Sequence, residues 1–169
     1  QSRMVHFRMN PYSDTEMLQI LKPLYILDEN EWDFILKFSR GIPGNAIHII
    51  EEGSVRDLRR LVFRLLERLD DIHTAEELRK ALSENKAEVT TVLDILLSFY
   101  RDCMMTLEGM ENRLINSDKK DMIIKIAKRF PKRKLLDKIN ILEGMRRSFE
   151  YNVNHQLGVD VLVMEIQEV

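Results

Sequence analysis

The chain has 169 residues, of which 44% are hydrophobic and 32% are charged, and its formal net charge at pH 7 is −2. This length suits one ordinary domain or two small ones, each with a core of its own. The 26 basic and 28 acidic residues nearly balance. The chain therefore has no overall field that attracts nucleic acid or an anionic membrane, which argues against a dedicated DNA-binding domain.

The single cysteine, Cys103, excludes a disulfide framework and a cysteine-rich metal site. Its position in an apolar stripe predicts a small core residue rather than a nucleophile. No apolar run approaches about 18 residues, so we expect no membrane-spanning segment. These features favour a cytoplasmic protein with a reduced thiol.

The first nine residues predict a short β-strand, because Val5, Phe7 and Met9 alternate with polar residues. A lone strand cannot pair its own backbone groups. We therefore expect residues 1–9 to be the remnant of a domain whose sheet precedes this chain.

Residues 10–52 predict a small unit of three helices, at about 14–22, 29–39 and 43–52. Ser13 and Glu16 have the spacing of a capping box, and Asp28 starts the second helix in a similar way. Pro43 suits the first turn of the third helix, where its missing N–H has no intrahelical partner.

Residues 53–169 predict a bundle of five or six helices after the break at Gly53. Apolar residues recur at helical spacing in four stretches and indicate one buried face in each. A shorter helix is expected to begin after Thr74, and a final helix from about residue 153 contains Gly158. The four apolar stretches run over about 58–69, 89–107, 122–130 and 135–149, and two further helices are expected at about 75–84 and 153–168.

Catalytic and metal motifs are absent from the sequence, which has no phosphate-binding loop, no nucleophile elbow and no zinc-binding helix. The four histidines, His6, His48, His73 and His155, lack the spacing that directs two imidazoles at one metal ion. We therefore expect no metal site and no enzymatic activity of the chain on its own.

Two stretches allow both a structural and a functional interpretation. Gly41, Pro43 and Gly44 form a tight entry to a helix whose backbone N–H groups could face a phosphate, or simply a turn between helices. The second stretch is a basic run that could contact a nucleic-acid backbone, or be a solvated loop. Its basic residues are Lys128, Arg129, Lys132, Arg133 and Lys134.

Several motifs together resemble the clamp-loader subunits of bacterial DNA polymerase III, most closely the delta prime type. Residues 2–4, Ser-Arg-Met, resemble the Ser-Arg-Cys segment that closes the nucleotide-binding domain of that family. Residues 39–47, SRGIPGNAI, resemble the turn of its lid domain. Residues 99–102, 114–118 and 152–157, which read FYRD, LINSD and NVNHQL, resemble signatures of its collar domain.

The resemblance implies an all-α AAA+ fragment: a strand remnant at 1–9, a three-helix lid at 10–52 and a helical collar at 53–169. It implies a structural subunit that does not hydrolyse ATP, because Gly44 and Asn45 replace the Arg and Asp of the nucleotide-sensing turn. Arg3 matches an arginine finger that acts on the ATP of a neighbouring subunit. No cofactor is expected in this fragment itself.

The collar is implied to assemble with delta and gamma/tau subunits, so that the complex loads a sliding clamp onto primed DNA. The final helix is apolar on several sides, which suits burial against partner subunits or within its own bundle. The candidate collar and interface residues are Tyr100, Arg101, Asp102, Asn152, Asn154, Leu157, Val161 and Met164.

Two alternatives remain open from the sequence. The chain could be the lid and collar of a gamma/tau type ATPase subunit, although Gly44 argues against this. It could also be a free-standing helical module that binds nucleic acid through residues 128–134.

Overall fold

The computed structural model describes residues 10–151 and 154–168. Within these ranges the chain forms nine α-helices and two short 3₁₀ helices, with no strand. This confirms the all-α class predicted from the sequence. The expected strand at residues 1–9 lies outside the described part of the chain. The chain divides into two compact units, one ending at Glu51 and the other beginning at Glu52.

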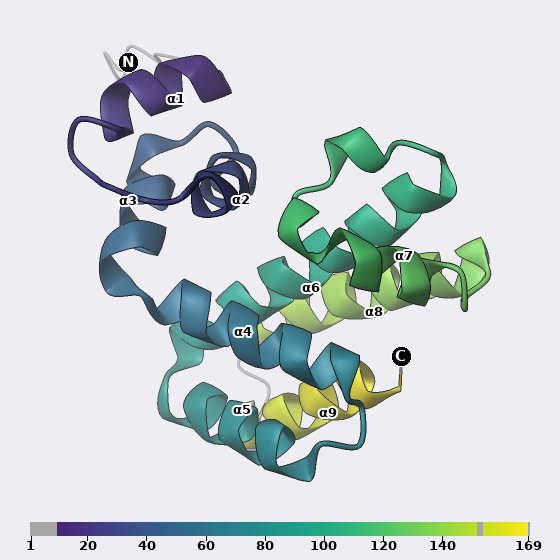
Figure 1. Cartoon of the computed structure of the whole chain (residues 1–169). Coiled ribbons are helices and arrows are strands. Elements are labelled where there is room, and N and C mark those ends of the chain that lie inside the picture. Colours follow the sequence, from purple (N-terminus) through teal and green to yellow (C-terminus); the bar gives the residue numbers. More distant parts are fainter. Residues whose placement is uncertain (1–9, 152–153, 169) are drawn as a thin grey trace, which may run out of the picture. The chain divides into compact units, whose positions relative to one another are not determined.

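The first unit contains α1 (Asp14–Leu21), α2 (Glu29–Ser39) and α3 (Pro43–Glu52), drawn in purple and blue in Figure 1. The capping box at Ser13 and Glu16 is present, and Asp28 caps α2 by accepting from the N–H of Glu31. One apolar face of each helix is buried. The core comprises Met17, Leu21, Trp32, Phe34, Ile35, Leu36, Ala46, Ile49 and Ile50.

The second unit contains six α-helices and both 3₁₀ helices. They are α4 (Ser54–Glu67), α5 (Ile72–Glu84), α6 (Lys86–Leu107), η1 (Glu111–Arg113), η2 (Ser117–Lys119), α7 (Lys120–Ala127), α8 (Lys132–Glu150) and α9 (His155–Gln167). The longest helix, α6, packs against α4, α5, α7 and α8. Figure 1 shows α4, α5 and α9 gathered as one group, with α7 and α8 beside α6.

Two predicted helix starts in the second unit were wrong by a few residues. The helix expected after Thr74 begins at Ile72, because Asp71 is the cap and accepts from both the N–H and the hydroxyl of Thr74. The final helix begins at His155 rather than near residue 153, because the Asn154 side chain caps it by accepting from the N–H of Leu157.

Candidate assembly surface

Helix α9 is anchored in the second unit by one apolar face. Val159, Leu162, Val163 and Ile166 recur at helical spacing and are all buried. They face α5, α4 and α8, the helices that α9 packs against. Burying four such side chains contributes on the order of several kcal/mol to folding, so α9 is a structural part of this unit.

Polar contacts at both ends of α9 fix its rotation. At the start of the helix, His155 Nε2 lies 2.8 Å from the carbonyl oxygen of Leu82 in α5. At its end, Gln167 Nε2 donates to the carbonyl of Leu69 over 3.0 Å. These contacts hold the same face of α9 toward its neighbours along the whole length of the helix.

A close approach also joins α9 to α8. The ring of Phe149 lies against Gly158, where a Cβ atom would come within 2.6 Å of the ring. The Lys138 ammonium in α8 donates to the carboxylate of Glu165 in α9 over 2.8 Å. Gly158 therefore serves packing between the two helices, which explains a glycine inside a helix.

The opposite face of α9 is an apolar stripe on the surface. Leu157, Val161 and Met164 recur at i, i+4 and i+7 and are 59%, 41% and 55% exposed. Single exposed apolar residues are ordinary, but three in register on a helix with a fixed rotation form a continuous patch. We call Leu157, Val161 and Met164 the assembly surface.

A polar groove of about 610 Å³ borders the assembly surface on the side of α5. Met164 forms part of its wall, and Arg79 lies between two carboxylates, 2.6 Å from that of Glu76 and 3.5 Å from that of Asp160. An apolar patch beside charged and polar groups resembles the core and rim of a protein–protein interface.

Two of the sequence motifs meet inside the second unit. The carboxylate of Asp102 is fully buried and accepts from the backbone N–H groups of Ile115 and Asn116 over 2.9 and 2.8 Å. It also accepts from Nδ2 of Asn116 over 2.9 Å and from Nη1 of Arg101 over 3.0 Å. These bonds satisfy a buried charge and tie α6 to the loop before α7.

Arg59 of α4 completes this network and had no motif to mark it in the sequence. Its Nε donates to Oδ1 of Asn116 over 3.1 Å, and its guanidinium forms two bonds to Asp118, at 2.6 and 3.1 Å. The guanidinium also lies 4.9 Å from the centre of the Phe63 ring. Only the fold could reveal this role, because Arg59 and Asn116 are far apart in the chain.

The structure separates the candidate collar residues into interior and surface. Tyr100 and Asp102 are buried, and burial raises the pKa of the Tyr100 hydroxyl, so it stays protonated. Arg101 is half-buried beside Asp102. Asn154 acts as the cap of α9, and Asn152 lies outside the described residues.

The turn between α2 and α3 uses its glycines in different ways. Gly41 has φ of +72°, and its carbonyl accepts from the N–H of Tyr12 over 2.8 Å. A Cβ at Gly41 would lie 2.3 Å from the Tyr12 carbonyl oxygen. Pro43 is the first residue of α3, and Gly44 faces open space. The structure therefore gives Gly41 a packing role.

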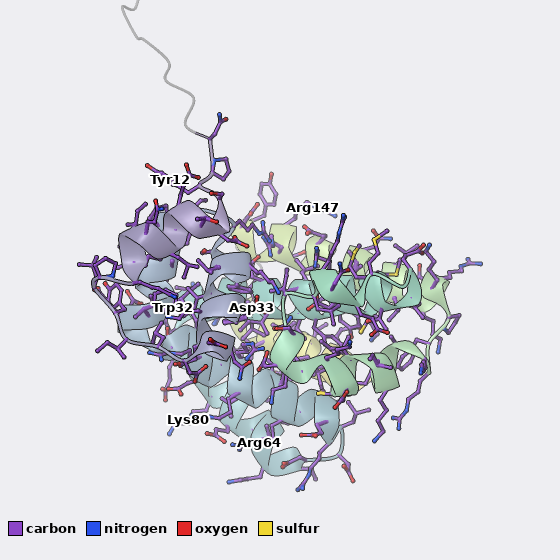
Figure 2. All side chains as sticks on the ribbon, turned by 45° about the horizontal axis from the view of Figure 1, so that its top comes forward. Tyr12, Trp32, Asp33, Arg64, Lys80 and Arg147 are labelled. Atoms are coloured by element: carbon purple, nitrogen blue, oxygen red, sulfur yellow. The ribbon has the colours of Figure 1, made fainter. Side chains whose placement is uncertain are left out.

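The basic run forms the corner between α7 and α8. Lys128 caps the end of α7, and Pro131 is the N-cap of α8. All five basic side chains of the run are exposed, and Lys132 forms an ion pair with Glu108. Arg3 lies outside the described residues. Charged groups also project elsewhere, as Arg147 in the last turn of α8 and Lys80 of α5 show in Figure 2.

Metal and membrane features are missing from the ranges that the structure covers. Residues 10–151 and 154–168 contain no cluster of three potential metal ligands. None of the helices in these ranges is long and apolar enough to cross a bilayer.

The side chain of Cys103 is buried in α6, which confirms the prediction that it is a core residue.

A family model for the C-terminal part of the DNA polymerase III delta subunit matches residues 56–168, well over half of the chain. The chain belongs to this clamp-loader family. The clamp-loader match runs from the first turn of α4 through the end of α9 and includes the assembly surface and the Asp102 network. Searches of curated proteins and of solved structures found no match.

The clamp-loader family predicted from the sequence is thus confirmed at the level of the family. The matching description names the delta subunit, so the delta prime type stays a prediction. The match begins after the first unit, and the assignment of that unit as a lid stays a prediction as well.

Proposed function

We propose that the second unit is the collar of a clamp-loader subunit and that it joins neighbouring collars through Leu157, Val161 and Met164. The observation that carries the proposal is the exposed apolar stripe of α9, which lies within the range matched to the clamp-loader family. The stripe faces away from the core of the second unit and is exposed to water. Contact with the surface of another subunit would bury it, which is favourable for apolar side chains.

The proposed partners are delta and gamma/tau type subunits of the same loader, acting in the cytoplasm on the sliding clamp and primed DNA. Two exposed patches pressed together would leave charged residues such as Arg79 and Asp160 at the rim. Such an arrangement supports a stable assembly without any catalytic group in the second unit.

The test is light scattering after size-exclusion chromatography, with the chain mixed with purified partner subunits. Replacing both Val161 and Met164 by lysine places two charges in the proposed contact. We expect binding to weaken by about 30-fold, which corresponds to about 2 kcal/mol. Leu136→Lys on α8 is the control, because Leu136 is 45% exposed and lies outside the assembly surface.

Equal loss of binding in the double variant and the control would reject α9 as the specific contact. Unchanged binding in the double variant would reject it as well. Both variants alter exposed positions, so circular dichroism should show the same helical content as the unchanged chain.

We further propose that this subunit does not hydrolyse ATP and that neighbouring subunits bind the nucleotide. The proposal rests on Gly44 and Asn45, which replace the Arg and Asp of the nucleotide-sensing turn in the family it resembles. Without a cation at that turn, the γ-phosphate of a bound nucleotide would lack one source of charge stabilisation.

The delta prime type can be tested through Arg3. If Arg3 is an arginine finger, Arg3→Ala in the full-length subunit should lower the ATPase rate of the assembled loader by about 10³-fold or more. The assembly itself should form normally. An unchanged ATPase rate would favour the delta type and leave the collar proposal untouched.

A further inference from the structure

The corner between α7 and α8 concentrates positive charge in a chain that is acidic overall. Residues 119–138 contain nine basic and two acidic residues, a net charge of +7, whereas the whole chain carries −2. The rest of the chain therefore carries −9. The near balance of charge over the whole chain therefore coexists with a positive local potential at residues 119–138, which can attract a polyanion.

Helix ends explain only some of these cations. Lys125 lies in the last turn of α7 and Lys128 caps it, where positive charge is favourable. Lys132, Arg133 and Lys134 occupy the first turn of α8, where positive charge opposes the helix dipole. That turn has no acidic residue and no side-chain cap. The ion pair with Glu108 accounts for Lys132, but the helix dipole does not favour Arg133 and Lys134 at this position, which suggests a functional role for them.

Most of the charge at this corner is available to a ligand. Lys128, Arg129, Arg133 and Lys134 are exposed, and none of them forms an ion pair within the part of the chain that the structure describes. Among the nine basic residues of the corner, Lys120, Lys132 and Lys138 do form ion pairs, with Glu111, Glu108 and Glu165. These four cations, two after the end of α7 and two in the first turn of α8, can each contact a phosphate.

An aromatic ring lies among these cations. Phe130 is partly exposed, and the ammonium of Lys134 lies 5.9 Å from the centre of its ring. Both residues border a hollow of about 290 Å³, whose floor includes Tyr100 and Leu135. Asp137, Glu165 and Glu168 also line the hollow, so a polyanion is expected to bind at the cations outside it rather than within it.

We propose that the corner between α7 and α8 binds single-stranded nucleic acid, with phosphates on Lys128, Arg129, Arg133 and Lys134 and a base against Phe130. Basic side chains around an accessible aromatic ring are the usual composition of a single-strand site, and Phe130 is partly exposed among such side chains. An acidic peptide would need the cations but not the ring. The proposal is independent of the assembly role of α9.

The test is fluorescence anisotropy of a labelled 20-nucleotide oligo-dT mixed with the 169-residue chain. With about four phosphate contacts, the affinity should fall by about 50-fold between 50 and 200 mM salt. Replacing Arg133 and Lys134 by alanine should weaken binding at 50 mM salt by about 10-fold and reduce the salt dependence.

The matched control replaces Lys80 in α5 and Arg147 in the last turn of α8, both labelled in Figure 2, by alanine, which removes the same charge from exposed positions outside the corner. This variant should bind oligo-dT like the unchanged chain. A second variant, Phe130→Leu, should weaken oligo-dT binding by about 5-fold or more and leave duplex binding unchanged.

Three outcomes would overturn the proposal. They are absence of binding at 50 mM salt, equal loss in the control and the Arg133 and Lys134 variant, and competition by polyglutamate as effective as by unlabelled oligo-dT. The last result would indicate a general polyanion or acidic-peptide site. Unchanged oligo-dT binding by Phe130→Leu would reject the contact with a base.

Discussion

Gly41, in the turn before α3, and Gly44, in the first turn of α3, lie three residues apart but have different surroundings. Gly41 has a positive φ and lies against the backbone of Tyr12, whereas a Cβ at Gly44 would meet nothing within 4 Å. The sequence could mark both as turn residues, but it could not separate them, because the contact with Tyr12 appears only once the turn has folded.

Gly41→Ala should destabilise the first unit by about 2 kcal/mol or more, since alanine at positive φ is strained and its Cβ would clash. Gly44→Ala should be neutral or stabilising by up to about 1 kcal/mol, because alanine favours the helix. Thermal unfolding followed by the fluorescence of buried Trp32 measures both. Similar effects of the two substitutions would contradict this account of Gly41.

Cys103 should resist thiol reagents in the folded protein. Burial, together with a smaller contribution from the nearby Asp102 carboxylate, raises the pKa of its thiol to about 12. The reactive thiolate is therefore about 10³-fold rarer at pH 8 than in the unfolded chain. Labelling by a thiol reagent should be slow in buffer and fast in urea, and fast labelling in buffer would contradict the prediction.

The same shift gives a pH dependence with a definite sign. The unfolded thiol loses its proton near its ordinary pKa, whereas the folded thiol keeps its proton up to about pH 12. Above pH 9 the unfolded state therefore binds fewer protons, so this residue makes stability fall as pH rises toward 12.

At the scale of elements, helix α9 shows what periodicity can and cannot predict. Apolar residues around much of its circumference predicted a helix covered on more than one side. They could not tell which face meets α5 and which stays exposed. That choice is made by contacts such as His155 with Leu82 and Gln167 with Leu69, which join residues distant in sequence.

The start of α5 illustrates a second limit. Asp71 and Thr74 are both good cap residues, and the sequence alone favoured Thr74. In the structure they act together, since the Asp71 carboxylate accepts from the N–H and the hydroxyl of Thr74. Two candidate caps three residues apart are therefore better interpreted as one cap with its partner.

Gly158→Ala tests the packing of α9 on α8. Its Cβ would lie 2.6 Å from the Phe149 ring, and the resulting strain should outweigh the better helix propensity of alanine. We expect a net loss of about 1 kcal/mol in urea unfolding. In a Phe149→Leu background the same substitution should instead stabilise by about 1 kcal/mol. The same sign in both backgrounds would contradict the proposed contact.

At the scale of the whole molecule, the sequence predicted the fold class and the clamp-loader family correctly. The short motifs succeeded because they mark positions that meet in space, as Asp102 and Asn116 do. The sequence did not predict Arg59, because an arginine beside another arginine on an amphipathic helix gives no signal of its own. The sequence showed the basic residues as a run. Only the observed start of α8 showed that some of them lie in its first turn, where positive charge is unfavourable to the helix dipole.

The most direct test is oxidation footprinting of Met164 in the assembled clamp loader, measured by mass spectrometry. Met164 and Met110 are both exposed, at 55% and 41%, and only Met164 belongs to the assembly surface. Collar assembly through α9 predicts that oxidation of Met164 falls by about 5-fold or more on mixing with the partner subunits, while oxidation of Met110 is unchanged. Equal oxidation of Met164 in the free chain and in the assembled complex would contradict assembly through α9.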